Sequence, residues 1–147
     1  MKTIILLTLT LCSCEMGIVD LMFYTDIPDL NLQTTQQVLS WVADNITYLA
    51  EPAGENHQQN PGLTYALKTG DCEDFSILCL FLLHRDANIT GRMIIGTKIT
   101  TGLRHAWIDV DNSWYEPQNA RLSNYYHEIY NCFYFYAYDQ LLGGYEL

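Results

Sequence analysis

Residues 70–83, with the sequence GDCEDFSILCLFLL, constrain the fold more than any other part of the chain, because most of them form a continuous apolar run. A helix that is apolar on nearly every side has no face to turn to water, so it belongs in the middle of a hydrophobic core. Gly70 reads as a turn residue and Asp71 as an N-cap, which predicts a helix that begins after Asp71 and ends near Arg85. The rest of the domain must be built around this helix.

The cysteine at the first position of this helix, Cys72, is the candidate catalytic nucleophile. The N–H groups of a first helical turn have no partner within the helix, and the helix dipole places positive charge there. Both effects favour a thiolate, and the same N–H groups could hold an oxyanion. The alternative is a structural role, because free cysteines usually behave as small buried hydrophobes. Cys79 fits that alternative, and its distance from Cys72, about 10 Å of helical rise, excludes a disulfide between them.

Acidic residues flank Cys72 on both sides, and their negative charge opposes formation of the thiolate. A nucleophilic cysteine at this position therefore needs a base within hydrogen-bond reach, and that base must be oriented by a third group. Among the four histidines, His105 is the best candidate because it lies in the most regular strand pattern of the chain. His127 is the second candidate, whereas favourable contact with the helix dipole is sufficient reason for His84 at the helix end.

A β-hairpin is predicted around His105. Residues 104–110 alternate between two faces, as in a strand with one face buried. Asp111 and Asn112 then form a tight turn, and residues 113–118 return as the next strand. In this register the last residue of the first strand pairs with the first residue of the second.

The third group of the site follows from the register of this hairpin. His105 then faces Gln118 directly and Glu116 diagonally, and diagonal neighbours lie within reach of long side chains. Asp109 shares this face but lies about 13 Å along the strand, at ~3.3 Å per residue, and is too distant to orient His105. We choose Glu116 as the orienting group and Gln118 as the alternative. A change of one residue in the turn would reverse the two faces of the strand.

The remaining elements complete an α+β domain. An amphipathic helix is predicted after the N-cap Thr34, and a loop rich in proline and glycine over residues 51–62. Further strands are predicted over residues 92–98 and 131–138, the second of them rich in aromatic residues. The apolar face of the first helix is expected to carry Val38, Trp41, Val42, Ile46 and Leu49. The predicted architecture is a buried cysteine-bearing helix packed on an antiparallel β-sheet.

The first residues of the chain predict a secretory signal of the lipoprotein type. Residues 3–11 form an apolar run that is too short to span a bilayer as a mature helix. The motif LCSC that follows resembles a bacterial lipobox, in which the last cysteine, here Cys14, is lipidated after cleavage. This predicts a membrane-anchored or secreted protein of the cell envelope; a buried N-terminal strand is the alternative. The expected division of the chain is a signal peptide over residues 1–13, an extension over 14–34 and one folded domain over 35–147.

Composition limits the classes of partner. The length of 147 residues suits a single domain with one core, and half of the residues are apolar, which argues against disorder. The net charge of −10 argues against nucleic acid as a partner, because binding to its backbone requires clustered lysine and arginine. No cofactor or metal site is predicted, and no calcium-binding loop is evident.

The order of three motifs, GDCEDFSILCLFLL, RHAWIDVD and SWYEP, resembles that of the transglutaminase-like cysteine-enzyme superfamily, especially the bacterial transglutaminase-like cysteine proteinases. The resemblance covers roughly residues 36–117. It implies a papain/transglutaminase-like core in which Cys72 is the nucleophile and His105 is the base. Glu116 stands where the family usually has aspartate, so the sequence departs from the family pattern at the third position.

This resemblance implies acyl transfer from an amide in a protein or peptide substrate. With water as the acceptor, the chain is a peptidase or amidase; with an amine it is a transglutaminase that cross-links proteins. Hydrolysis is favoured because neither an amine-binding module nor a calcium loop is evident. The second oxyanion donor is open, with Tyr65 and Gln59 as candidates. An alternative from another class is a non-catalytic surface binding module that retains the fold.

Overall fold

The computed structural model describes residues 27–52 and 57–141, except for the side chain of Cys132. The predicted signal peptide and the lipidation site Cys14 lie outside these residues. Within the described part, no helix combines the length and the apolar character that crossing a membrane requires. The helices are α2 (Thr35–Asn45), α3 (Pro61–Leu67), α4 (Cys72–Ala87), α5 (Tyr126–Ile129) and α6 (Tyr138–Leu141). The strands are β1 (Thr47–Tyr48), β2 (Thr69–Gly70), β3 (Arg92–Lys98), β4 (Arg104–Val110), β5 (Ser113–Glu116), β6 (Arg121–Leu122) and β7 (Tyr130–Ala137).

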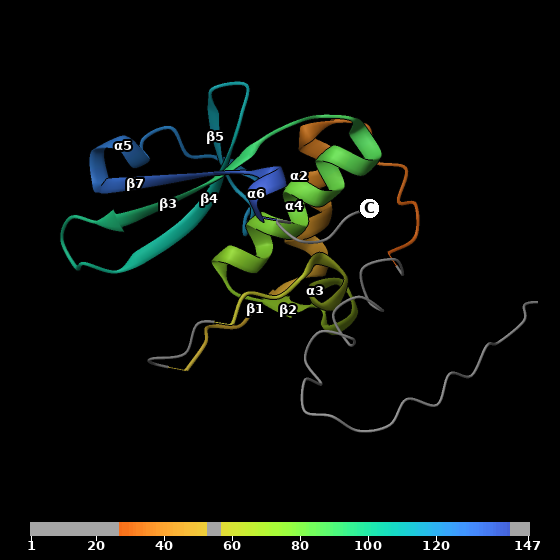
Figure 1. Ribbon diagram of the computed structural model, residues 1–147, viewed down its shortest axis with the longest axis horizontal. Helices are drawn as coiled ribbons and strands as arrows, with labels where there is room; N and C mark the ends of the chain where they lie inside the picture. Colours follow the sequence, from red (N-terminus) through yellow and green to blue (C-terminus); the bar gives the residue numbers. More distant parts are fainter. Residues whose placement is uncertain (1–26, 53–56, 142–147) are drawn as a thin grey trace, which may run out of the picture.

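Helix α4 is the central element, as the apolar run predicts. Every residue from Asp74 to Leu83 is buried, and the helix lies between the sheet and helices α2 and α3 (Figure 1). Asp71 is the N-cap, and its carboxylate accepts hydrogen bonds from two N–H groups of the first turn. Asn88, in the left-handed conformation, ends the helix. The predicted start of the helix is therefore confirmed, and the helix runs slightly beyond its expected end.

A glycine is needed at position 70 because β2 passes very close to the start of α4, and not because the chain turns there. Gly70 lies buried in β2, and a Cβ atom at this position would meet the Cβ of Asp74 at 2.6 Å. Asp74 is the partner of Asp71 in a capping box, with its side chain accepting from the Asp71 N–H at 3.0 Å. A side chain at Gly70 would thus push against the start of α4.

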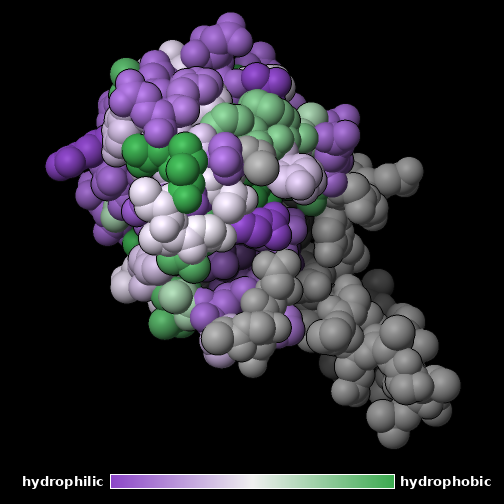
Figure 2. Space-filling model, turned by 90° about the vertical axis from the view of Figure 1, so that its left-hand side faces the viewer, coloured by the Kyte–Doolittle hydropathy of each residue, from purple (hydrophilic) through white to green (hydrophobic). Residues whose placement is uncertain are grey.

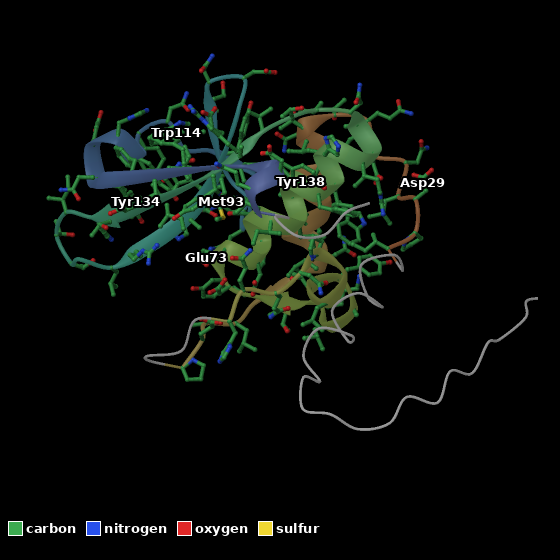
Figure 3. The ribbon with its side chains drawn as sticks, viewed as in Figure 1. Asp29, Glu73, Met93, Trp114, Tyr134 and Tyr138 are labelled. Carbon is green, nitrogen blue, oxygen red and sulfur yellow. The ribbon has the colours of Figure 1, made fainter. Side chains whose placement is uncertain are left out.

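The main sheet has five strands in the order β6-β5-β4-β3-β7, and every neighbouring pair is antiparallel. One face packs on α4, and the other carries a second, aromatic-rich cluster that includes Trp107 and Trp114. In Figure 3, Met93 and Trp114 mark these opposite faces. The predicted alternation along β4 is confirmed, because Ala106 and Ile108 belong to the first cluster. This is the α+β architecture expected from the sequence.

Helix α2, the loop before α3 and strand β5 have bounds that differ from the predicted ones. Helix α2 stops at Asn45 because the chain turns to an extended conformation and pairs β1 with β2; Leu49 is consequently 62% exposed and not part of the helix face. The predicted loop is shorter, since Pro61 occupies the first turn of α3. Strand β5 ends at Glu116, and the next four residues form turns instead of continuing to Gln118.

Candidate active site

Cys72 is the first residue of α4 and is half-buried. The Asp71 carboxylate accepts from the N–H groups of Glu73 and Asp74 at 2.9 and 3.2 Å. The cap thus uses the second and third N–H groups of the helix and not the first, that of Cys72 itself. A backbone N–H at a helix start, beside a thiol, is suited to bind a carbonyl oxygen.

The imidazole of His105 lies between Cys72 and Glu116. Its Nε2 atom is 2.5 Å from Oε2 of Glu116, and the Cys72 thiol lies close enough to contribute to the raised pKa of His105. Burial lowers the pKa of His105, but the hydrogen bonds and negative charge of Cys72 and Glu116 outweigh that effect and raise it to about 9. The three residues chosen from the sequence therefore meet in one buried chain of contacts.

Glu116 is held on both of its carboxylate oxygens. The hydroxyl of Tyr126 donates to Oε2 at 2.9 Å, and the backbone N–H of Gln118 donates to Oε1 at 3.2 Å. The carboxylate is 4% exposed. A buried carboxylate with several donors keeps a fixed orientation, so Glu116 can hold the His105 ring in one position.

The hairpin register explains why Glu116 reaches His105. Val110 pairs with Ser113, as predicted, and both turn residues, Asp111 and Asn112, have positive φ angles of 51° and 61°. This is the geometry of a two-residue hairpin turn. The hydrogen bond from Gln118 to Glu116 comes from its backbone N–H, because the strand ends before it, and its side-chain Nε2 is buried without a hydrogen-bond partner among the described residues.

The structure gives the two residues named as oxyanion candidates contacts that do not involve Cys72. The ring of Tyr65 stacks on Trp41 at a centroid distance of 5.7 Å, and the Lys68 ammonium lies 3.4 Å from the Tyr65 centroid. The N–H of Gln59 donates to Oδ1 of Asp74 at 2.8 Å. Gln59 thus supports the carboxylate that closes the capping box, and Tyr65 joins α3 to α2.

Buried acid and thiol groups near the site are perturbed by their surroundings. Burial raises the pKa of Asp74 to about 7, although the hydrogen bonds from Gln59 and Asp71 oppose the shift. Burial also raises the pKa of the Cys79 thiol, and a weaker contribution comes from the charge of Glu116. Cys79 is fully buried, which agrees with the structural role expected for it.

Three tyrosines near the site were not singled out from the sequence. Tyr126 holds Glu116, Tyr130 lies parallel to His105 with 5.9 Å between ring centroids, and Tyr48 lies on β1 beside the start of α4. The chain contains 11 tyrosines, and no periodic pattern separates these three from the others. Their places near the site become visible only in the folded structure, where distant segments of the chain come together.

A pocket of about 250 Å³ lies at the start of α4, and Cys72, His105 and Glu116 are not among the residues that line it. Glu73 and Arg104, the neighbours of Cys72 and His105 in the sequence, line it together with the apolar side chains of Met93 and Ile95. Glu73 lies at the start of α4 and Met93 above it on β3 (Figure 3). On the side of the molecule that carries the β3–β4 turn, hydrophobic residues form small separate spots among hydrophilic ones (Figure 2).

No group of three or more histidine, cysteine, aspartate and glutamate side chains in residues 27–52 and 57–141 is arranged to hold a metal ion. The acidic side chains at the start of α4 are instead used by backbone donors, as in the capping box of Asp71 and Asp74.

Comparison with known proteins agrees with this geometry. The sequence model of the Transglutaminase-like superfamily matches residues 24–119, a range that includes all three candidate residues and well over half of the chain. No curated protein matches the sequence.

Solved structures of LapG from Legionella pneumophila are similar in fold. The calcium-bound form has a TM-score of 0.55 at 15% identity, over 66% of this chain and 60% of LapG. A second LapG structure has a TM-score of 0.55 at 14% identity, over 72% of this chain and 68% of LapG. An EGTA-treated form gives 0.51 at 17% identity, over 60% of this chain and 53% of LapG. The chain thus spans 60% of the length of calcium-bound LapG, and the likeness is one of fold.

Proposed function

Because this chain belongs to the transglutaminase-like superfamily, we propose that it is a thiol acyl-transfer enzyme acting on amide bonds, in the first place a peptidase or amidase. Cys72 is the nucleophile, His105 the base and Glu116 the group that orients His105. The observation that carries this proposal is the buried contact of 2.5 Å between Glu116 and His105, with Cys72 at the start of α4 close enough to raise the pKa of His105.

Each residue has a defined role in the proposed reaction. His105 takes the proton of Cys72, and the thiolate attacks the carbonyl carbon of the scissile amide. The N–H of Cys72 stabilises the oxyanion, and His105 then gives its proton to the leaving nitrogen. Glu116 stabilises the imidazolium that exists between these two proton transfers. A pKa of about 9 supports this role, because His105 then carries a proton at neutral pH.

The substrate in this proposal is a protein or peptide, and the acceptor is water. An amine acceptor would make the chain a transglutaminase, and the same triad serves either acceptor. The two are separated by incubating the enzyme with casein in the presence of a fluorescent primary amine. New peptide N-termini support hydrolysis, whereas amine incorporated into casein supports cross-linking. The assay is run with calcium and with EGTA, because LapG was solved in both forms.

The experiment that tests the proposal is alkylation of single cysteines by iodoacetamide, mapped by mass spectrometry. Stoichiometric labelling of Cys72 near pH 6 is expected, with buried Cys79 unlabelled in the same folded sample. The variant His105→Ala should lose labelling at pH 6 and regain it only at alkaline pH. Labelling of wild-type Cys72 only above pH 8 would instead favour a non-catalytic binding module that keeps the fold.

A further inference from the structure

An acyl-transfer site of this kind needs a second donor for the oxyanion besides the Cys72 N–H. We propose that this donor is the phenol hydroxyl of Tyr48, which would make Tyr48 a catalytic residue. The inference rests on the proposed function, because an oxyanion forms only if Cys72 attacks a carbonyl group.

The backbone fixes Tyr48 beside the start of α4. Strand β1 runs parallel to β2, and Tyr48 pairs with Gly70. Gly70 is two residues before Cys72 in the sequence. The next residue, Leu49, donates its N–H to the Gly70 carbonyl at 2.9 Å. In Figure 1 both short strands lie at the end of α4 where the helix begins. The position of Tyr48 is therefore tied to the chain segment that leads into the nucleophile.

The side chain of Tyr48 covers the first turn of α4. Its ring lies 6.4 Å from that of Phe75, and Phe75 is three residues after Cys72, hence on the same face of the helix. Tyr48 is 49% exposed, so a bound substrate can reach this residue. Burial and the negative charges of Cys72, Asp71 and Glu116 raise the pKa of Tyr48. The phenol thus stays protonated, as a donor must be.

Tyr130 is the rival, because its phenol also lies near Cys72 and Glu116, whose charges together with burial raise its pKa. However, the ring of Tyr130 packs against the imidazole of His105, with 5.9 Å between the ring centroids. Tyr48 comes from the side of β2 and the helix start, where the Cys72 N–H lies. Two donors to one oxygen must converge from that side, so the geometry favours Tyr48.

The proposed step balances as follows. The sulfur of Cys72 forms a bond to the carbonyl carbon, and the π electrons of the C=O bond move to its oxygen. The Tyr48 hydroxyl and the Cys72 N–H donate hydrogen bonds to this oxyanion, and both keep their protons. When the C=O bond re-forms, the carbon–nitrogen bond breaks, and His105 gives the nitrogen the proton that it took from the thiol.

The test compares two reactions of Cys72, of which only one forms an oxyanion. The probes are 4-nitrophenyl acetate, which acylates the thiol through a tetrahedral intermediate, and iodoacetamide, which alkylates it without one. Tyr48→Phe should slow the acylation by about 100-fold, as expected for the loss of one oxyanion donor. Alkylation and the melting temperature should remain as in the wild type. Tyr134→Phe, a change at an exposed tyrosine on β7, is the matched control and should alter neither rate.

Each of the other possible outcomes would overturn either the assignment of Tyr48 or the proposed function. Wild-type acylation in Tyr48→Phe, or a loss in Tyr130→Phe alone, would overturn the assignment of Tyr48. An equal loss of acylation and alkylation in Tyr48→Phe would show a structural role and would also overturn it. A wild-type chain that is alkylated at Cys72 but never acylated would overturn the proposed function itself, and the assignment with it.

Discussion

At the scale of single residues, one carboxylate connects the proposed chemistry to the rest of the domain. Oε2 of Glu116 accepts from both the Tyr126 hydroxyl and the His105 ring, while Oε1 accepts from a backbone N–H. Such a carboxylate cannot rotate without breaking several hydrogen bonds in a buried site. The orientation of His105 is therefore built into the fold and does not await a substrate.

The first prediction concerns this carboxylate. Glu116→Gln should leave the fold intact but lower acyl-transfer turnover by roughly two orders of magnitude or more, because the imidazolium loses its negative partner. Glu116→Asp keeps the charge and restores the family's usual residue, so it should retain more activity than Glu116→Gln. Gln118→Ala should have little effect, since Gln118 contacts Glu116 through its backbone. Steady-state kinetics on the four proteins check the order; a total loss in Gln118→Ala would refute the orienting role of Glu116.

The second prediction follows from the raised pKa of His105, about 9 in the folded chain against an ordinary 6.5. A raised histidine pKa stabilises the fold while the group is protonated, so this contribution is complete below about pH 6.5 and is lost as the pH rises through about 9. The expected loss is on the order of 3 kcal/mol. Urea unfolding from pH 6 to 10 should show it in the wild type and much less of it in Glu116→Gln. Equal pH slopes in both proteins would contradict the coupling.

The residues of the site differ in whether a pattern in the sequence predicts them. Cys72, His105 and Glu116 each stand at a patterned place: a helix start, a strand face and a hairpin register. The structure brings all three together. Tyr126 leaves no such signal, because a single helical turn directly before β7 places it. Its contact with Glu116 depends on tertiary structure that no local pattern encodes.

At the scale of elements, the accuracy of prediction follows length and periodicity. Helix α4 and strand β3 were predictable because each carries a run of consecutive apolar residues, and strand β4 because its residues alternate between two faces. The strands β1 and β2 have two residues each and exist only because they pair with one another across more than 20 residues of chain. This pairing also ends α2 early and exposes Leu49, which the helical period alone would place on the buried face.

The third prediction tests how closely β2 must approach the helix start. In Gly70→Ala the new Cβ would meet the Cβ of Asp74 at 2.6 Å, and neither atom can rotate away. We expect a loss of about 1–3 kcal/mol in the free energy of unfolding and slower alkylation of Cys72 at pH 6. Gly102→Ala is the control: it is strained by a positive φ of 70° but has open space around it, and it lies in the turn between β3 and β4 and not at the start of α4. It should lower stability without slowing alkylation. Equal alkylation rates in both variants would contradict a role of Gly70 in placing Cys72.

At the scale of the whole molecule, the fold class follows from one physical requirement. A helix that is apolar all round must be covered on every side, and the strand patterns that follow it in the sequence provide a sheet for one side. Helices α2 and α3 cover the other side, and residues 27–32 add Ile27, Leu30 and Leu32 to the core. The order of the strands in the sheet was not predictable, because it depends on which edge strand β7 pairs with. It pairs with β3, at the end of the sheet opposite β6.

The last prediction concerns the place of the whole chain in a cell, and it depends on residues before the described domain. The motif LCSC ends at Cys14 after an apolar run, and we propose that Cys14 is lipidated. One diacylglycerol-bearing cysteine with an acylated amino group carries enough hydrocarbon for stable membrane binding. The wild type should therefore fractionate with membranes of a bacterial host, and Cys14→Ala should move to the soluble fraction. Cys72→Ala, which alters the site and not the anchor, should stay with the membranes. Mass spectrometry of the wild type showing an intact Met1 and no lipid on Cys14 would refute the anchor and leave the proposed chemistry of Cys72 untouched.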